Sequence, residues 1–125
     1  MPAKYGSAYL SARHMRRTEL LPARERLEAA GVEVTSRWLD DLNQPEGIAH
    51  VSRQDIARAE VYILLGDERG DSGHRHVEFG IAMALGKMII VVAPEAENTW
   101  QRLPGVTVVP EWESVYTLVS KGADK

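Results

Sequence analysis

Two short apolar runs decide the fold, Val61-Tyr-Ile-Leu-Leu65 and Lys87-Met-Ile-Ile-Val-Val-Ala93. Continuous runs of this length, rich in β-branched residues, are typical of strands buried on both faces of a parallel sheet. Between them, apolar residues recur every four positions, which predicts a helix over His76–Leu85. Gly86 follows, where a helix commonly ends on a left-handed residue. Together these segments predict a helix crossing between two neighbouring parallel strands.

The same alternation extends in both directions along the chain. Further strands are expected at Tyr5–Leu10, Val32–Trp38 and Val106–Val109. Further helices are expected at Thr18–Ala30, Ile48–Arg58 and Trp112–Lys121, and loops at Asp40–Gly47, Gly66–Gly73 and Pro94–Gly105. Strands that alternate with helices form right-handed crossovers. The sequence therefore predicts one α/β domain over residues 1–125: a Rossmann-like (flavodoxin-like), doubly wound sheet of five mostly parallel strands with helices on both faces.

Length and composition argue against several classes of protein. The chain has 125 residues, no cysteine and a net charge of −3, which excludes disulfide scaffolds, thiol nucleophiles and thiolate metal sites. Mild acidity argues against binding to a nucleic-acid polymer, because such proteins are usually basic. The longest apolar run, Met88–Pro94, is too short to span a membrane, and Met1–Gly6 lacks the apolar core of a signal peptide. We expect a cytoplasmic protein with no membrane partner.

A ligand site is expected at the carboxyl ends of the strands, between the first and third strands. In open α/β sheets, ligands bind where the strand order reverses, and this is the reversal point of the favoured order. Two long polar segments follow these strands, Ser11–Arg17 and Gly66–Glu78. Neither segment is needed to close the sheet, so both are candidates for binding or catalysis.

Two carboxylates stand out in the second segment. Glu78 is expected in the first turn of its helix, where the helix dipole favours an ionised carboxylate. An ionised, positioned carboxylate can attack a sugar carbon as a nucleophile. Asp71 precedes it by seven residues, and two nearby carboxylates can divide nucleophilic and acidic roles. The alternatives are an ordinary first-turn acidic residue and an ordinary turn aspartate.

Basic residues suggest an anion rather than a metal. Arg13, Arg16 and Arg17 lie between a strand and a helix, where a phosphate is often held, although a solvated helix start also fits. His74 and His76 with the two carboxylates invite a metal interpretation, but an H-x-H pair alone is weak. The chain contains no Walker loop, no G-x-G-x-x-G after the first strand and no G-x-S-x-G elbow. We expect neither a metal nor a cofactor.

The segment Asp71–Val92, with its core His76-Val-Glu-Phe-Gly-Ile-Ala-Met-Ala-Leu-Gly-Lys, resembles the nucleoside 2-deoxyribosyltransferase family and its nucleotide N-hydrolase relatives. Asp55–Leu64 is similar to the segment that leads into that family's third strand, and Tyr9–Arg13 to its first strand and substrate loop. Pro94–Asn98 is similar to a stretch that in relatives reaches the site of a neighbouring subunit. The resemblance covers most of the chain.

The resemblance implies a Rossmann-like fold, a homodimer or larger assembly, and cleavage of a nucleoside N-glycosidic bond. Glu78 matches the family's nucleophile, which forms a glycosyl-enzyme intermediate, and Asp71 matches a loop aspartate that helps proton transfer at the base. Ser11, Arg13 and Arg16 fall where hydrolase relatives hold a 5′-phosphate. The expected partner is a nucleoside or its 5′-monophosphate.

The sugar contacts depart from the family pattern. Relatives usually place a sugar-binding aspartate eight residues before the aspartate of an Ala-Asp pair; here the pair is Ala59-Glu60 and the position is Ser52. Asp55 lies three residues on and could substitute only in part. The remaining expected substrate contacts are Gly73, His74 and Asn98.

Three functions remain open from the sequence. The leading one is an enzyme that cleaves nucleosides or nucleotides, by hydrolysis or by base exchange, and the presence of Glu78 favours it. The second is a module of the same fold that binds or senses a nucleotide without turnover, which Ser52 favours. The third is a dimerising scaffold.

Overall fold

The computed structural model describes residues 5–13, 16–40, 45–66 and 73–120. Within them, five strands form one parallel sheet in the order β2-β1-β3-β4-β5, as the sequence predicts. The strands are β1 (Ser7–Ser11), β2 (Glu33–Val34), β3 (Val61–Leu65), β4 (Met88–Val92) and β5 (Val106–Val109). The helices are α1 (Arg17–Ala29), α2 (Pro45–Arg58), α3 (Gly73–Ala84) and α4 (Trp112–Ser120), with 3₁₀ turns η2 (Arg37–Asp40) and η3 (Thr99–Arg102).

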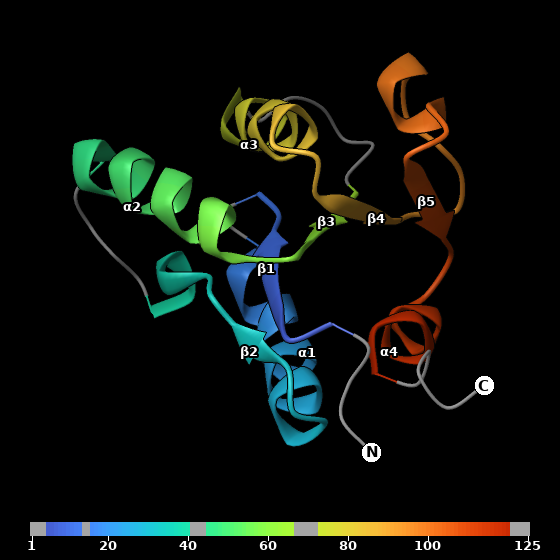
Figure 1. Cartoon of the computed structure of the whole chain (residues 1–125), viewed down its shortest axis with the longest axis horizontal. Helices are drawn as coiled ribbons and strands as arrows, with labels where there is room; N and C mark the ends of the chain where they lie inside the picture. Colours follow the sequence, from blue (N-terminus) through green and yellow to red (C-terminus); the bar gives the residue numbers. More distant parts are fainter. Residues whose placement is uncertain (1–4, 14–15, 41–44, 67–72, 121–125) are drawn as a thin grey trace.

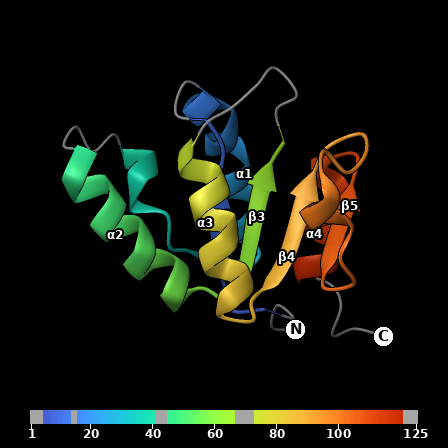
Figure 2. The ribbon, with the colours of Figure 1, turned by 90° about the horizontal axis from the view of Figure 1, so that it is seen from above.

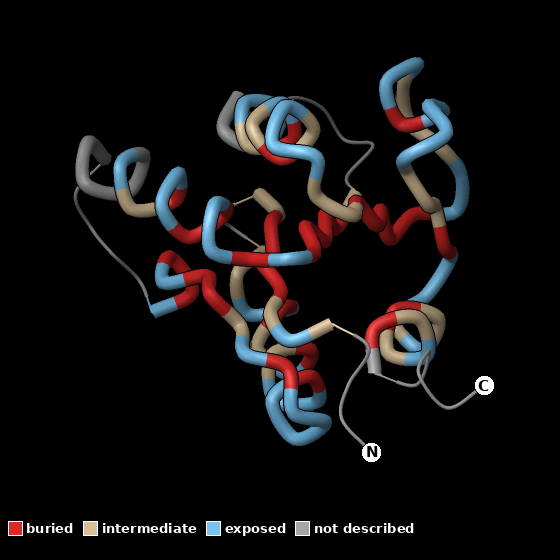
Figure 3. Tube along the Cα trace, in the orientation of Figure 1, coloured by how far each residue is buried: buried red, intermediate tan, exposed pale blue. Residues whose placement is uncertain are grey.

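The helices cover the sheet from both sides. Helices α2 and α3 lie on one face, and α1 and α4 lie on the other (Figure 1). The buried parts of the trace run through the central strands (Figure 3), and every residue of β3 is buried. No helix within the described ranges is long and apolar enough to cross a lipid bilayer.

The strand register places an aromatic row beneath α3. Tyr9 of β1 pairs with Tyr62 of β3, and their rings stack with centroids 5.8 Å apart and planes 7° apart. Phe79 of α3 meets Tyr62 edge-on at 6.3 Å. This aromatic row therefore fixes α3 over β1 and β3. Strands β3 and β4 point the same way (Figure 2), so the carboxyl ends of the parallel strands share one edge.

The second strand is shorter than the predicted Val32–Trp38, and this prediction is wrong beyond Val34. The backbone N–H and carbonyl of Leu10 on β1 form hydrogen bonds with side chains, in place of the hydrogen bonds that a longer β2 would provide. Its N–H donates to Ser36 Oγ at 2.6 Å, and its carbonyl accepts from Trp38 Nε1 at 2.8 Å. Once side chains replace the ladder, the chain can turn into η2.

Two helices begin three residues earlier than predicted. Helix α2 starts at Pro45 rather than Ile48, because proline at the first helical position costs no hydrogen bond. Helix α3 starts at Gly73 rather than His76. The predicted helix ends agree with the structure: Gly31 follows α1 with φ 91° and Gly86 follows α3 with φ 73°, the left-handed conformation that glycine adopts without strain.

Candidate active site

Two hydroxyl groups from β1 hold the carboxylate of Glu78. Tyr9 Oη donates to Glu78 Oε2 at 3.0 Å, and Ser11 Oγ donates to Oε1 at 2.8 Å. Residues two apart on a strand face the same side, so both hydroxyls point toward α3, where Glu78 lies. The side chains of Tyr9 and Ser11 are completely buried, whereas Glu78 is half-buried. The site therefore presents a fixed carboxylate near the carboxyl end of β1.

Tyr9 remains a hydrogen-bond donor over the whole physiological pH range. Burial raises the pKa of its hydroxyl well above the ordinary value of about 10, and the negative charge of Glu78 raises it further. The Ser52 side chain lies close enough to lower this pKa in part, although its geometry falls short of a hydrogen bond. A neutral Tyr9 can therefore act as the hydrogen-bond donor to Glu78.

The predicted placement of Glu78 in the first helical turn is wrong. Because α3 begins at Gly73, Glu78 is in the second turn, and the first turn holds no acidic residue. The dipole effect fades beyond the first turn. Among the contacts described for this carboxylate, the two hydroxyls on β1 hold it in place.

The two candidate sugar-binding residues on α2 have different surroundings. Ser52 is buried, and its Oγ has no hydrogen-bond partner among the described residues. Asp55 is also buried, but its carboxylate accepts from the backbone and side chain of Arg37, with Nη2 2.8 Å away. That hydrogen bonding raises the pKa of Arg37. Asp55 thus ties η2 to α2, while Ser52 faces the Tyr9 hydroxyl.

The candidate anion-binding arginines follow β1. Arg16 makes a two-point contact with Glu19 at 2.7 and 2.8 Å, and its Nη1 donates to the Gly66 carbonyl at 2.8 Å. The guanidinium therefore joins the segment after β1 to the end of β3. Arg13 is half-buried, and its carbonyl accepts from the Arg16 N–H. Arg17 donates to the Leu39 carbonyl at 2.6 Å, which makes it a support for η2.

Other predicted site residues lie outside this cluster. Asp71 falls outside the described residues, and Gly73 and His74 are placed only as backbone in the first turn of α3. Asn98 caps η3, because its Oδ1 accepts from the Gln101 N–H at 3.1 Å. Among the described side chains, no group of three or more acidic, histidine or cysteine residues is arranged to hold a metal ion.

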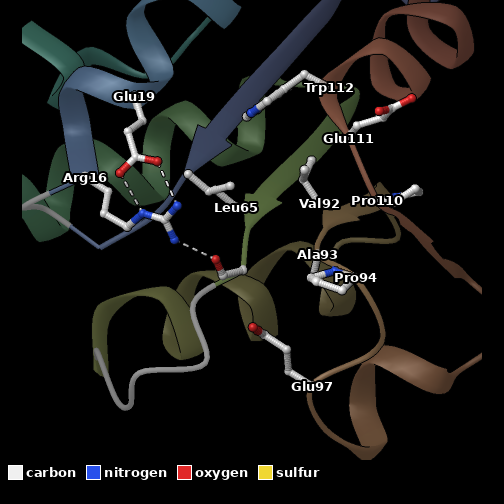
Figure 4. Close-up of a pocket in the computed structure, with 11 residues that line it drawn as sticks. Arg16, Glu19, Leu65, Val92, Ala93, Pro94, Glu97, Pro110, Glu111 and Trp112 are labelled. Carbon is white, nitrogen blue, oxygen red and sulfur yellow. Dashed lines mark hydrogen bonds and ion pairs between the residues drawn. The ribbon is translucent and has the colours of Figure 1, made fainter.

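A cavity of about 760 Å³ opens at the same edge of the sheet, on the face covered by α1 and α4 (Figure 4). Leu65 and Val92 lie at its centre, between Arg16 on one side and Trp112 on the other. Glu78 does not line it, because its carboxylate reaches the edge from the opposite face of the sheet. The hydrogen bond from Arg16 to the Gly66 carbonyl lies where this cavity and the Glu78 site approach each other.

Sequence reasoning did not assign a role to Tyr9, although it contacts the predicted nucleophile. One signal was available: Tyr9 and Ser11 alternate on one strand, so a polar contact for Ser11 implies that Tyr9 faces the same side. Gln101 was missed as well. It is buried, and its Oε1 accepts from the Glu97 N–H at 2.7 Å, which no local pattern indicates.

Comparisons with known proteins identify enzymes of similar fold. No protein-family model and no curated protein sequence matches the chain. Among solved structures, the chain is similar to the CMP N-glycosidase BcmB of Clostridium botulinum, with 20% identity, a TM-score of 0.65 and coverage of 90% of this chain and 96% of that one. It is also similar to a 2-deoxyribosyltransferase from Bacillus psychrosaccharolyticus, with 18% identity, a TM-score of 0.68 and coverage of 88% and 90%. The chain therefore has the α/β fold that these two enzymes share.

Proposed function

We propose that the protein cleaves the N-glycosidic bond of a nucleoside or a nucleoside 5′-monophosphate, with Glu78 as the nucleophile. The observation that carries the proposal is the fixed Glu78 carboxylate, held by Tyr9 and Ser11 beside the reversal point of the sheet. The shared fold with an N-glycosidase and a deoxyribosyltransferase supports it.

The proposed reaction has two steps. In the first, a Glu78 oxygen forms a bond to C1′ of the sugar, the bond from C1′ to the base nitrogen breaks, and its electron pair leaves with the base, which takes up a proton. The transition state resembles an oxocarbenium ion, which a nearby carboxylate stabilises. In the second, water or the nitrogen of another base attacks C1′ and gives up a proton to the group that protonated the first base, while the bond from C1′ to the Glu78 oxygen breaks and restores the carboxylate. Water gives hydrolysis, and a second base gives base exchange.

The proton for the leaving base would come from a group other than Glu78, because the nucleophile must be ionised. Asp71 is the proposed donor, with His74 or His76 as the alternative. The 5′-phosphate would lie near Ser11, Arg13 and Arg16. Arg16 already contacts Glu19, so a phosphate there would share the guanidinium with that carboxylate.

A second candidate function, a nucleotide-binding module without turnover, shares one requirement with the enzyme, although both similar structures are enzymes. The Ser52 hydroxyl is buried without a partner among the described residues, which supports a site that needs a ligand hydroxyl or a water to complete it. A nucleotide-binding module without turnover would have the same need. Ser52, Asp55, Gly73 and His74 are retained as proposed substrate contacts under either function.

We also propose that the chain acts as a single cytoplasmic domain within a symmetric homodimer. The large apolar side chains that remain exposed among the described residues are Val77 on α3, Leu85 directly after it, and Trp100 and Leu103 at η3. A second copy would cover such side chains and would bring Asn98 near the partner's site. A monomer in sedimentation at micromolar concentration would remove the dimer.

The experiment that tests the proposed function is base release. Purified protein is incubated with a panel of nucleosides and nucleoside 5′-monophosphates, with and without a second base, and free base is measured by chromatography. Release by the wild type together with its loss in Glu78→Gln supports the enzyme. Nucleotide binding without release from any member of the panel supports the binding module instead.

A further inference from the structure

Helix α3 has a second apolar face, which points away from the sheet. Every residue from Phe79 to Leu85 is apolar. Phe79 and Ala82 are buried and face the sheet. The outward face carries further apolar residues at the spacing i, i+3, i+4, i+7 and i+8, which places them in one line along a helix. This outer stripe consists of Val77, Gly80, Ile81, Ala84 and Leu85.

The outer stripe is exposed to solvent. Val77 is 63% exposed at one end of it, and Leu85 is 52% exposed at the other. The exposed residues of α1, by contrast, are mostly charged, as Glu25, Arg26 and Glu28 show. A helix that is apolar on all sides is normally buried. We therefore expect that a partner covers the outer stripe when the protein is assembled.

No contact within the described part of the chain explains why residue 80 is glycine. A Cβ on Gly80 would meet none of the described atoms within 4 Å. Glycine in a helix interior destabilises the helix relative to alanine, so the small size of Gly80 has a cost and no benefit inside this chain. Ala84, one turn further along, is also small. The distance between two packed helices depends on the side chains at their contact, so this part of the stripe lets another helix approach closely.

The exposed apolar area agrees with what a dimer of this chain needs. Trp100 and Leu103 at η3 are exposed as well, and η3 lies on the same side of the sheet as α3 (Figure 1). With Val77 and Leu85, these side chains expose roughly 300 Å² of apolar surface per copy. A standard interface takes about 800 Å² from each partner, of which somewhat more than half is apolar. The four side chains therefore supply about half of the apolar area that such an interface requires.

We propose that the outer stripe of α3 packs against the outer stripe of a second copy of this chain, with Gly80 where the two helices approach most closely. A two-fold axis brings the same patch of both copies together, so the patch must be complementary to itself. The stripe contains no charged residue, so no like charges face each other across the axis. Homodimer interfaces are also more apolar than other interfaces. The inference rests on the proposed function only in taking a homodimer as the assembly.

The partner's helix would lie beside the candidate active site. Val77 directly precedes Glu78 and Ile81 follows it by less than one helical turn, so the stripe flanks Glu78 on the surface of the helix. The carboxylate of Glu78 points away from the stripe, toward Tyr9 and Ser11 on β1. A second copy therefore covers the stripe without displacing these hydrogen bonds.

The test is the mass of the protein in solution, measured by sedimentation at micromolar concentrations. The wild type should be a dimer. Gly80→Arg should raise the dissociation constant at least about a hundredfold, because it places an unpaired charge in an apolar contact. Arginine is a better helix former than glycine, so circular dichroism should show that this variant is folded. Ala29→Arg is the matched control and should stay dimeric, because Ala29 is exposed on α1, which covers the opposite face of the sheet.

A second variant keeps the inference testable if Gly80→Arg does not fold. Leu85→Glu adds a charge at the end of the stripe, on a side chain that is already exposed, and should also dissociate the dimer. A monomeric wild type overturns the inference, and binding of that monomer to phospholipid vesicles would assign the stripe to a membrane instead. A dimer that the folded charged variant leaves intact overturns it as well. These measurements use no substrate, so a dimer that depends on the stripe supports the inference even if no base is released and the proposed cleavage fails.

Discussion

Removing the hydroxyl of Tyr9 should slow the reaction without unfolding the protein. Tyr9→Phe deletes the donor that lies 3.0 Å from Glu78 Oε2, while the ring remains to stack on Tyr62 at 5.8 Å. Ser11→Ala deletes the second donor, 2.8 Å from Oε1. Each change removes one of the two hydroxyl donors described for this carboxylate.

The expected magnitude follows from the type of hydrogen bond. A bond from a hydroxyl to a charged group contributes about 1.5–3 kcal/mol, and each 1.4 kcal/mol on the barrier changes the rate about tenfold. Either variant should therefore lower kcat by roughly 10- to 150-fold. Both hydroxyls contact the same carboxylate, so the double variant should deviate from the product of the two single effects.

The assay is base release under saturating substrate, with the melting temperature measured for each variant. Tyr116→Phe is the matched control, because Tyr116 lies on α4, where it stacks on Trp112 and contacts Arg26. It should retain the wild-type kcat. If Tyr9→Phe and Ser11→Ala both turn over within about twofold of the wild type while folded, the proposed role of the two hydroxyls is refuted.

Three further predictions concern pH, phosphate and stability. The pKa of Tyr9 is raised in the folded state, so its contribution to the free energy of unfolding is complete below the unfolded pKa of about 10. This contribution is lost as the pH rises toward the folded pKa, by up to about 1.4 kcal/mol per pH unit. Tyr9→Phe should reduce this alkaline loss of stability in denaturant titrations. Arg13→Ala should weaken monophosphate binding by at least about tenfold and spare free nucleosides, whereas equal loss for both would make Arg13 structural. Asp55→Asn should lower the free energy of unfolding by about 1–3 kcal/mol, because it weakens the buried contact with Arg37; unchanged urea unfolding would contradict this role.

The sheet was predictable because two of its strands, β3 and β4, are apolar throughout. Two runs in the sequence coincide with β3 and β4, and alternation with helices is enough to predict the parallel order. The second strand was overpredicted, since Ser36 and Trp38 replace its ladder with side-chain contacts to Leu10. Such contacts join residues far apart in sequence, and local propensity carries no signal for them.

The location of the candidate site could be predicted from the sequence, but the contacts that position Glu78 could be predicted only in part. Topology places the ends of β1 and β3 together, which brings Ser11 and Glu78 into contact. The start of α3 was misplaced because Gly73 and the two residues after it lack apolar periodicity. That error made the helix dipole the expected electrostatic partner of Glu78, whereas in the structure its carboxylate accepts hydrogen bonds from two buried hydroxyls. Gln101 accepts from the Glu97 N–H four residues earlier, a local contact that no apolar pattern in the sequence indicates.

The most direct test of the central claim is the intact mass of the protein during turnover. A substrate analogue whose glycosyl intermediate hydrolyses slowly is mixed with the wild type and with Glu78→Gln, and the adduct is located by peptide mapping. The wild type should gain the mass of one sugar on the peptide containing Glu78, with release of one base, and Glu78→Gln should gain none. Base release with no adduct on Glu78, or near wild-type turnover by Glu78→Gln, would contradict the assignment of Glu78 as the nucleophile.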